Sequence, residues 1–521
     1  MTVVSAQSVL QGPRPSVLDG SRDVGARPHL MVVAGMLVVL LAAALRLHDL
    51  GDGSLTHDEA WRVNGMRAGD LDMRRWFPPG QMAVSWTLQH ALGTSELLVR
   101  LPSAACGLGA VMLLAWLVPR RLGLAAGVAA AACLAFHPQA IIYSRVVKEF
   151  GYEMLLTVVV AWAGSALIEH PDRKSLRVFT AVSIGAMCFG FAPVLLVAAW
   201  GPLALWSLRS ARREDPELTR RFILAGIVIV GLAVSLYLWW SGCRFRQGIM
   251  QYFTTTEKAW PPPFHPVDTA AWVTDRSWAL ARYVFGVSAI WEPLATVLAT
   301  LCLLAGAVGA GVLWRRWRVF VIFTATLLLI AVIAGFARQW PYGAFRNNTY
   351  LAPLAAVYVG CGIVELLRVL SVAPARVLVI GSLLVVPAVR AVRAAAQLTP
   401  DEHLRPVIAE VRPQLQPDDA IFVYYATDDA FAYYWPDPEV EALVQPRSDR
   451  GLDDRFEARF CELLERNRRV WLLMTHPFGD ERARWRAVAE RHGALLKHIT
   501  SGTADAWCFV PHLDRAADGA G

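Results

Sequence analysis

The segment LTHDEAWR, residues 55–62, places two carboxylates side by side after a run of about 15 apolar residues. A carboxylate that is held next to a hydroxyl group can take its proton, so we expect Asp58 to act as a general base. Glu59 is expected to orient either Asp58 or the acceptor group. Pairs of acidic residues in loops are also common as simple solvent-exposed groups, so the pair alone does not establish the chemistry.

Three cations further along the chain could bind an anion. Arg145 and Lys148 lie in the segment YSRVVKEFGYE, and Arg346 lies in QWPYGAFRNN. If the first segment is helical, the spacing of three places Arg145 and Lys148 on the same side of the helix. Such groups at a membrane boundary suit an amphiphile with an anionic head. The alternative is that each is an ordinary cation that extends its charge to the membrane interface.

The elements that must position these residues are membrane helices. The chain of 521 residues is 55% hydrophobic and 18% charged, with a mean hydropathy of +0.39, which is more apolar than usual for a soluble protein. The apolar blocks predict about eleven spans. They are residues 30–47, 100–118, 122–142, 152–168, 177–191, 193–208, 222–240, 288–313, 318–337, 350–368 and 376–393.

The basic connections between the blocks set the orientation. The net charge of +7 does not indicate nucleic acid, because Lys and Arg occur in short clusters between apolar blocks. With residues 1–29 as a disordered cytoplasmic tail, a count of eleven puts these clusters on the cytoplasmic side and the candidate residues on the outer face. If residues 81–92 also spanned the membrane, the number of spans would be even and the basic clusters would no longer all lie on the cytoplasmic side. We therefore expect these residues to form a helix on the outer membrane surface. Residues 30–47 could alternatively be a cleaved signal sequence.

The chain is therefore expected to contain a transmembrane catalytic domain, residues 30–393, and a small α/β domain on the outer face, residues 394–521. The second domain alternates helical patterns with short apolar runs. Helices are expected at 403–415, 455–467 and 480–492, and the apolar runs are 420–425, 470–474 and 506–510. The eight cysteines form no CxxC pair, and no His/Asp cluster has ligand spacing, so neither a metal nor a cofactor is expected.

Five motifs, taken in order, carry a resemblance to a known family. Asp58–Glu59 comes first, followed by FPPG (77–80), where the family usually has His-Pro-Pro-Leu, and SELLVRLPSA (95–104), close to S-E-x-x-x-R-x-P-S-A. YSRVVKEFGYE (143–153) matches a turn that often reads Y-S-R-E-x-K-x-Y-x-x-E, and WPYGAFR (340–346) resembles Y-P-F-G-x-R. The chain thus resembles the GT-C class of membrane glycosyltransferases. It is most similar to the bacterial relatives of protein O-mannosyltransferases and of the lipid A aminoarabinose transferase.

The resemblance implies roles for particular residues. Asp58 would be the catalytic base, and Arg145, Lys148 and Arg346 would contact the phosphate of a lipid-linked donor. Candidate substrate contacts are His57, Trp61, Arg100, Glu153 and Tyr342, although His57 could be a local hydrogen-bonding partner and Trp61 an aromatic residue of the membrane interface. The chain departs from the family at Phe77, Val146 and Phe150, which stand where His, Glu and Tyr are usual. These departures leave the donor and the acceptor open.

The function expected from these observations is transfer of a hexosyl or pentosyl group, with inversion, from a polyprenyl-phosphate donor. The acceptor would be a glycolipid, a polysaccharide or a protein on the periplasmic or extracytoplasmic face of a multi-pass inner (plasma) membrane protein. A transporter or flippase of lipid-linked anionic sugars would use the same cations but would not need Asp58. Transporters often contain two similar halves, and the sequence shows no internal repeat. A GT-C scaffold that only binds its ligand is a third alternative.

Overall fold

The computed structural model describes residues 28–68, 77–211, 215–242, 245–255, 257–263, 265–288, 291–396, 402–445 and 454–512. The expected tail, residues 1–29, lies outside the described residues except for its last two, which begin the first helix. The chain divides into two compact units, and each is described by itself. The membrane unit comprises Met1–His48, Leu71–Ala91 and Arg100–Ala395, and the α/β unit comprises Asp49–Asp70, Leu92–Val99 and Ala396–Gly521.

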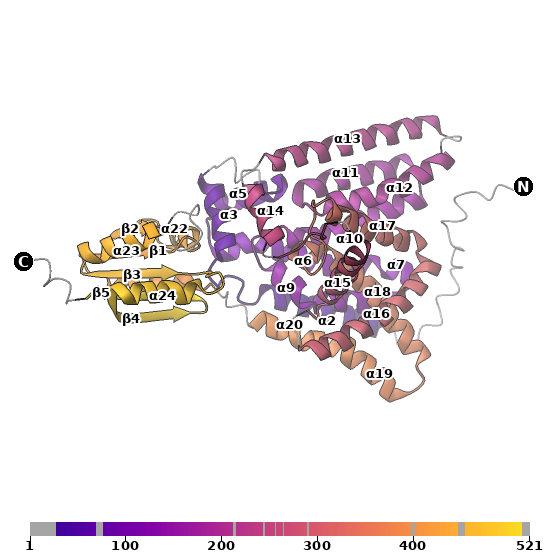
Figure 1. The fold of residues 1–521 in the computed structure, drawn as a ribbon. Coiled ribbons are helices and arrows are strands. Elements are labelled where there is room, and N and C mark those ends of the chain that lie inside the picture. The colour runs from indigo at the N-terminus through magenta and orange to yellow at the C-terminus, as the bar shows by residue number, and fades with distance from the viewer. Residues whose placement is uncertain are drawn as a thin grey trace, which may run out of the picture. The chain divides into compact units, whose positions relative to one another are not determined.

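The membrane unit is built from helices (Figure 1). They are α2 (Pro28–Leu47), α5 (Pro79–Leu92), α6 (Glu96–Leu117), α7 (Pro119–Leu122), α8 (Leu124–Ala135), α9 (Pro138–Ser144), α10 (Phe150–Glu169), α11 (Arg173–Phe189), α12 (Pro193–Ala211), α13 (Pro216–Ser241), α14 (Phe245–Thr255), α15 (Pro266–Val284), α16 (Glu292–Arg316), α17 (Arg318–Phe336), the 3₁₀ helix η2 (Arg346–Leu351), α18 (Ala352–Val369), α19 (Ala373–Ile380), the π-helix η3 (Gly381–Val385) and α20 (Val386–Ala396). Helices α11, α12 and α13 pack side by side (Figure 1).

Each of the apolar blocks contains a helix among the described residues, and the chain is a multi-pass membrane protein. Among the described residues, eight helical segments are long and apolar enough to span a membrane, and the bent pair α8–α9 would make a ninth. Helix α11 has 17 residues, and the apolar part of α12 covers only Pro193–Ser207. The sequence expectation of about eleven spans includes these two shorter helices. The expected surface helix is present as α5, while its place at the membrane surface stays a prediction.

A break between α8 and α9 bends the chain by 64°. Pro138 begins α9, and it has no N–H group to continue the hydrogen bonding of α8. The carbonyl groups at the end of α8 are instead bound by a buried cation. Arg46, at the end of α2, donates to the carbonyl oxygens of Leu134 and Ala135, each at 3.2 Å. A charge inside an apolar helical unit thus satisfies the polar groups that the break exposes.

Glycines allow α16 and α18 to approach each other closely. A Cβ atom at Gly362 would lie 1.8 Å from the carbonyl oxygen of Ala305, and one at Gly309 would lie 1.9 Å from that of Tyr358. Only a residue without a side chain fits such a contact, as is common between membrane helices. Helix α18 also packs against α8. Helix α18, which follows Arg346 in the chain, is therefore held between α16 and α8.

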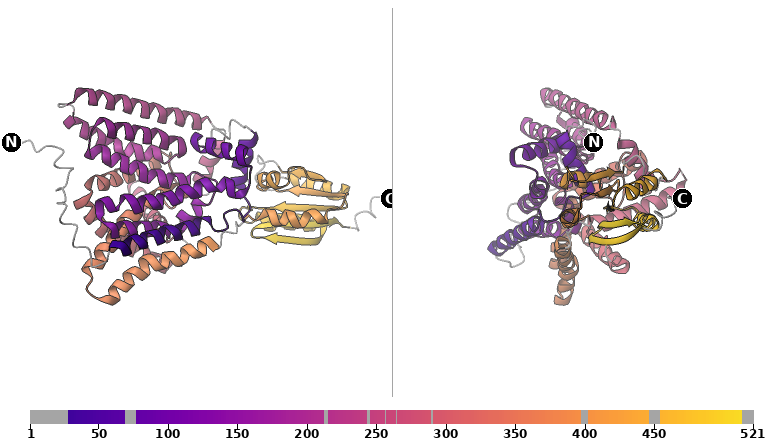
Figure 2. Two further views of the ribbon diagram at one scale, coloured as in Figure 1. Left: turned by 180° about the vertical axis from the view of Figure 1, so that it is seen from behind. Right: turned by 90° about the vertical axis from the view of Figure 1, so that its left-hand side faces the viewer.

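The α/β unit contains a five-stranded sheet and short helices (Figure 2). Its elements are α3 (His57–Ala68), α21 (Leu404–Val411), the 3₁₀ helix η4 (Arg412–Gln414), β1 (Asp419–Val423), α22 (Asp428–Tyr434), β2 (Glu441–Val444), α23 (Asp454–Arg466), β3 (Arg469–Met474), α24 (Glu481–His492), β4 (Gly493–Ser501) and β5 (Ala504–Pro511). The strand order is β2-β1-β3-β5-β4. Strands β2, β1 and β3 are parallel, and β5 and β4 complete the sheet in antiparallel pairs.

The core of this unit lies between the sheet and its helices. Phe460 of α23 and Trp485 of α24 pack with Phe422 of β1 on one face, and α21 packs against β4 and β5. All three expected helices and all three expected apolar runs are present, whereas α22, β2 and β4 were not predicted. The expected fold class, a helical membrane protein with a small C-terminal α/β domain, is confirmed.

Residues 49–70 and 92–99 fold with the C-terminal residues. Helix α3 packs against α22, the amide of Leu55 donates to the Tyr434 hydroxyl at 2.6 Å, and Asn64 donates to the carbonyl oxygen of Asp429 at 2.7 Å. The compact unit therefore contains residues 49–70 and 92–99 as well as the C-terminal segment. The division of the chain into functional domains at residue 393 stays a prediction.

Candidate functional site

The two adjacent carboxylates lie in the first turn of α3 and differ in their surroundings. Glu59 is buried, with 1% of its surface exposed. Its Oε2 atom accepts from the backbone amide of Thr56 at 3.0 Å, and its own amide lies 3.4 Å from the Thr56 hydroxyl. This is a capping box, in which residues three apart satisfy each other's amides at a helix start. Glu59 therefore fixes the turn that carries Asp58.

Asp58 is only half-buried, so its carboxylate can be approached from solvent. Its place in the first turn of α3 also favours a negative charge, because the unpaired amides at a helix start carry partial positive charge. The pattern Thr-x-x-Glu was visible in the sequence, and it distinguishes the two carboxylates. The structure gives the buried one a local structural role and leaves the other accessible.

Contacts from the C-terminal segment hold the chain just before α3. The Tyr434 hydroxyl accepts from the amide of Leu55 and donates to Glu96 at 3.1 Å. Burial raises the pKa of Tyr434 well above its usual value, so the hydroxyl keeps its proton and remains a donor. Arg405 pairs with the same Glu96 at 2.8 Å. These bonds connect three segments of the α/β unit around the start of α3.

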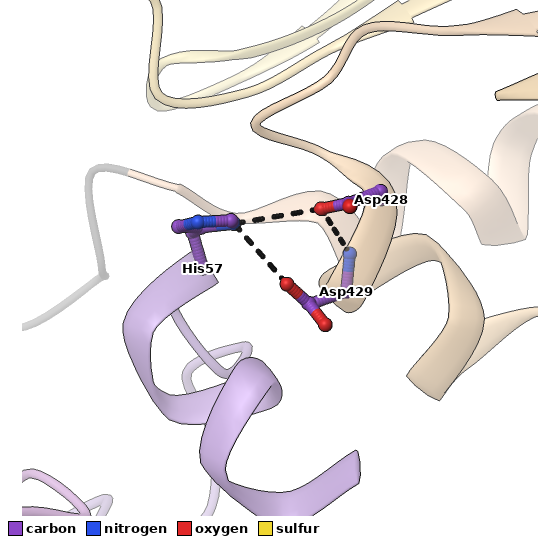
Figure 3. Close-up of side chains that lie close together, drawn as sticks. All are labelled: His57, Asp428 and Asp429. Atoms are coloured by element: carbon purple, nitrogen blue, oxygen red, sulfur yellow. Dashed lines mark hydrogen bonds and ion pairs between the residues drawn. The ribbon is translucent and has the colours of Figure 1, made fainter. Parts of the chain in front are cut away.

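His57 and Trp61 flank the carboxylate pair in α3, and both are half-buried. The backbone amide of His57 donates to Glu402. The His57 Nδ1 atom lies 3.9 Å from a carboxylate oxygen of Asp428 and 3.9 Å from one of Asp429 (Figure 3). His57 thus has local partners, which was one of the two expectations for it, and its contact with a substrate stays a prediction, as does that of Trp61.

In the membrane unit, Arg145 and Lys148 lie in a bend between α9 and α10. The condition that this segment is helical is not met, because α9 ends at Ser144 and α10 begins only at Phe150. The argument that a helical spacing of three aligns the two cations therefore does not hold. Both side chains are nonetheless buried, with 5% and 8% of their surfaces exposed.

Arg145 has a structural role that the sequence did not show. Its Nη1 atom donates to the carbonyl oxygens of Leu45 at 3.2 Å and Ala395 at 3.4 Å. These carbonyls lie in the last turns of α2 and α20, where helical partners are missing and a cation is favoured. Arg145 therefore joins the ends of two helices that are far apart in sequence.

Arg346 is exposed and begins η2. Asn348 fixes the preceding loop by donating to the carbonyl oxygens of Pro341 and Gly343, both at 2.9 Å. Helix η2 packs against α9, α10 and α15. Burial raises the pKa of Tyr283 in α15, and the positive charge of Arg346 partly opposes that shift. The membrane unit thus brings η2, which carries Arg346, against α9, the helix that ends directly before Arg145.

Three other candidate substrate contacts are buried inside the membrane unit. The Tyr342 hydroxyl lies 2.9 Å from the Ser277 hydroxyl, and Arg100 has 6% of its surface exposed. Glu153 is fully buried, and its Oε1 atom accepts from the amides of Phe191 at 2.8 Å and Ala192 at 2.9 Å. Glu153 thus stabilises the turn between α11 and α12. Contact of these three residues with a substrate stays a prediction.

Comparison with solved structures finds similar chains at low sequence identity. ArnT from Cupriavidus metallidurans in the apo state has a TM-score of 0.51 and 14% identity, over 92% of this chain and 97% of that one. The same protein bound to undecaprenyl phosphate has a TM-score of 0.42 and 16% identity over the same shares. The oligosaccharyltransferase AglB from Archaeoglobus fulgidus, in complex with an inhibitory peptide and a dolichol-phosphate, has a TM-score of 0.48 and 12% identity, over 92% of this chain and 74% of that one.

Comparisons at the level of sequence add no relative. No protein-family model matches the chain, and no curated protein matches it. The fold that the motifs predict is nevertheless the one found. The chain has the fold of the GT-C membrane glycosyltransferases.

Proposed function

We propose that this protein is an integral membrane glycosyltransferase that transfers a sugar from a polyprenyl-phosphate donor to an acceptor on the outer face of the plasma membrane. The observation that carries the proposal is Asp58. In a chain with the GT-C fold, this half-exposed carboxylate lies on the first turn of α3, which a buried capping box and the Tyr434 hydroxyl hold in place. The sequence resemblance assigns the catalytic base to the same residue.

In the proposed reaction, Asp58 takes a proton from an acceptor hydroxyl group. The hydroxyl oxygen attacks the anomeric carbon of the sugar from the side opposite to the phosphate. The bond between that carbon and the phosphate oxygen breaks, and the polyprenyl phosphate leaves with the bonding electrons. The configuration at the anomeric carbon is therefore inverted. A phosphate leaving group needs no general acid, so one base is sufficient.

The cations of the membrane unit would bind the donor phosphate. Arg346 is exposed at the start of η2, and Lys148 lies in the bend before α10. Positive charge that is positioned before the reaction stabilises the negative charge that grows on the leaving phosphate. Arg145 would act mainly by fixing the ends of α2 and α20 near this bend. The proposal requires only that the acceptor has a free hydroxyl group, whether it is a glycolipid, a polysaccharide or a protein.

The test uses purified protein in lipid vesicles with a set of polyprenyl-phosphate sugars and hydroxyl acceptors, and detects the glycosylated product by mass spectrometry. Because general-base catalysis is worth about 10²–10⁴-fold, Asp58→Asn should lower the transfer rate by about that factor. Asp52→Asn, an exposed aspartate in the same loop, is the matched control and should transfer at the wild-type rate.

Two results would contradict the proposal. Near-normal transfer by Asp58→Asn would remove the residue from the mechanism. Movement of the lipid across the vesicle membrane without any product, from every donor tried, would identify a transporter of lipid-linked sugars.

A further inference from the structure

The part of the chain that the structure describes contains one group of side chains able to hold a metal ion: His57, Asp428 and Asp429. One nitrogen or oxygen atom from each lies within 4.8 Å of the other two. Figure 3 shows the imidazole of His57 at the start of α3 facing the two carboxylates at the start of α22. Both helices belong to the α/β unit.

The distances in this group fit an intervening ion better than direct hydrogen bonds. His57 Nδ1 is 3.9 Å from the nearer oxygen of each aspartate, which is longer than a hydrogen bond between nitrogen and oxygen. Ligand atoms on one Zn²⁺ ion, at about 2.0–2.2 Å each, stand about 3.3–3.6 Å apart in tetrahedral geometry. Side-chain rotations that shorten the two 3.9 Å separations, and a separation of at most 4.8 Å between the two carboxylate oxygens, would close the group around an ion.

Burial and charge favour a cation at the same place. His57 Nδ1 and Asp429 Oδ2 are both buried from solvent. A further carboxylate, Glu402, accepts from the backbone amide of His57 and interacts with the imidazole of His476. Three carboxylates thus surround two imidazoles in a partly buried space. Concentrating negative charge away from water is costly unless a cation compensates it.

We propose that His57 Nδ1 and one carboxylate oxygen each from Asp428 and Asp429 bind a divalent transition-metal ion of the Zn²⁺ or Mn²⁺ class. An imidazole ligand favours such ions over Mg²⁺ and Ca²⁺, which prefer oxygen ligands only. Three protein ligands leave one position of a tetrahedral ion for water or for an oxygen of a bound molecule.

Hydrogen bonds from neighbouring groups already orient these ligands. The amide of Asp429 donates to Asp428 Oδ1 at 2.7 Å, and Asn64 of α3 donates to the carbonyl oxygen of Asp429 at 2.7 Å. Contacts of this kind hold ligating side chains in position and affect metal affinity. The bound ion would attach the start of α3 to α22, and His57 is the residue before Asp58. The site is therefore expected to position the proposed base.

The sequence alone predicted no metal, because that expectation depended on ligands that are close together along the chain. Here, one ligand comes from the first outer loop and two come from the C-terminal segment, so no local spacing could show the site. Folding of these segments into one unit brings them together.

The test measures metal binding by the full-length protein after chelator treatment and dialysis. Titration with Zn²⁺ and with Mn²⁺ should give one tightly bound ion per chain, as measured by calorimetry and elemental analysis. The double variant Asp428→Asn/Asp429→Asn should bind at least 100-fold more weakly. Asp437→Asn, which changes an exposed aspartate soon after α22, is the matched control and should bind as the wild type does.

Two measurements on the wild type do not depend on whether the double variant folds. X-ray absorption of the zinc-loaded protein should show nitrogen and oxygen ligands without sulfur. Zinc should also slow amide hydrogen exchange in residues 55–60. Equal zinc affinity of the wild type and a folded double variant, sulfur ligation by cysteine, or no binding at millimolar concentrations of either ion would each overturn the proposal. None of these results depends on the identity of the sugar donor, so the metal site and the proposed function can fail separately.

Discussion

The capping box at the start of α3 makes a sharp prediction about how the two adjacent carboxylates differ. Replacing Glu59 with Ala removes the acceptor of the Thr56 amide, which lies 3.0 Å from Glu59 Oε2. The backbone of α3 would otherwise be unchanged, because alanine is a good helix former. The first turn should therefore open more often, while the rest of the helix stays packed against α22.

The size of the effect follows from these contacts. Loss of an N-terminal cap costs about 0.5–2 kcal/mol, and a buried donor left without its acceptor costs about 1–3 kcal/mol. Glu59→Ala leaves the Thr56 hydroxyl in place as the cap and removes only the acceptor of the Thr56 amide, so we expect the second cost, about 1–3 kcal/mol. At about 1.4 kcal/mol per factor of ten, amides in the first turn should exchange about 5- to 150-fold faster. Glu59→Gln keeps a neutral acceptor and should show a smaller increase.

The assay is hydrogen exchange measured by mass spectrometry on peptides that cover residues 55–60, with Asp52→Ala as a control for a surface charge in the same loop. Asp58→Asn should leave exchange within a few-fold of the wild type and lower the transfer rate. Unchanged exchange in Glu59→Ala would show that the capping box does not hold this turn. A lost transfer rate with unchanged exchange would assign a chemical role to Glu59, and the positioning argument would be wrong.

Three further predictions concern the membrane unit and its orientation. Arg346→Gln should lower the turnover rate by about 10²–10³-fold, the usual effect of removing one stabilising donor, and excess donor should not restore it; full rescue would mean that Arg346 only recruits the lipid. In a background without reactive native cysteines, Asp437→Cys should react with an impermeant thiol reagent in intact spheroplasts, whereas Lys174→Cys should react only after the spheroplasts are lysed. The reverse pattern would contradict the orientation. Gly309→Ala should destabilise the protein by about 1–3 kcal/mol or more by overpacking, measured as thermal unfolding in detergent, whereas Gly306→Ala in the same helix, with no atom within 4 Å of the added Cβ, should be nearly neutral.

Much of the fold could be predicted because its signals are local. Long apolar blocks mark most helices of the membrane unit, although not α15 or the start of η2 with Arg346, and strand and helix patterns mark six elements of the α/β unit. Helix α22 was missed because seven residues, DDAFAYY, are too short to show a helical period. Strand β4 was missed because most of its side chains are exposed, as expected for an edge strand without a buried face.

The candidate site was predicted less completely, because several roles depend on partners that are distant in sequence. Arg145 contacts the ends of two helices, and Glu153 contacts the turn before α12. No pattern around either residue identifies those partners. The capping box is different, since the Thr-x-x-Glu signal of Thr56 and Glu59 was present in the sequence and could have separated Glu59 from Asp58.

The packing of α3 indicates that the C-terminal segment helps to position the turn that carries Asp58. Helix α3 has twelve residues, a length at which isolated helices are marginal in water. Its buried side chains include Ala60, Val63 and Met66, and the helix packs against α22 of the C-terminal segment. The turn that carries Asp58 therefore depends for its position on residues at the other end of the chain. The C-terminal segment is thus part of the structure that presents the proposed base, and changes at Tyr434 or in α22 should affect transfer without touching a substrate.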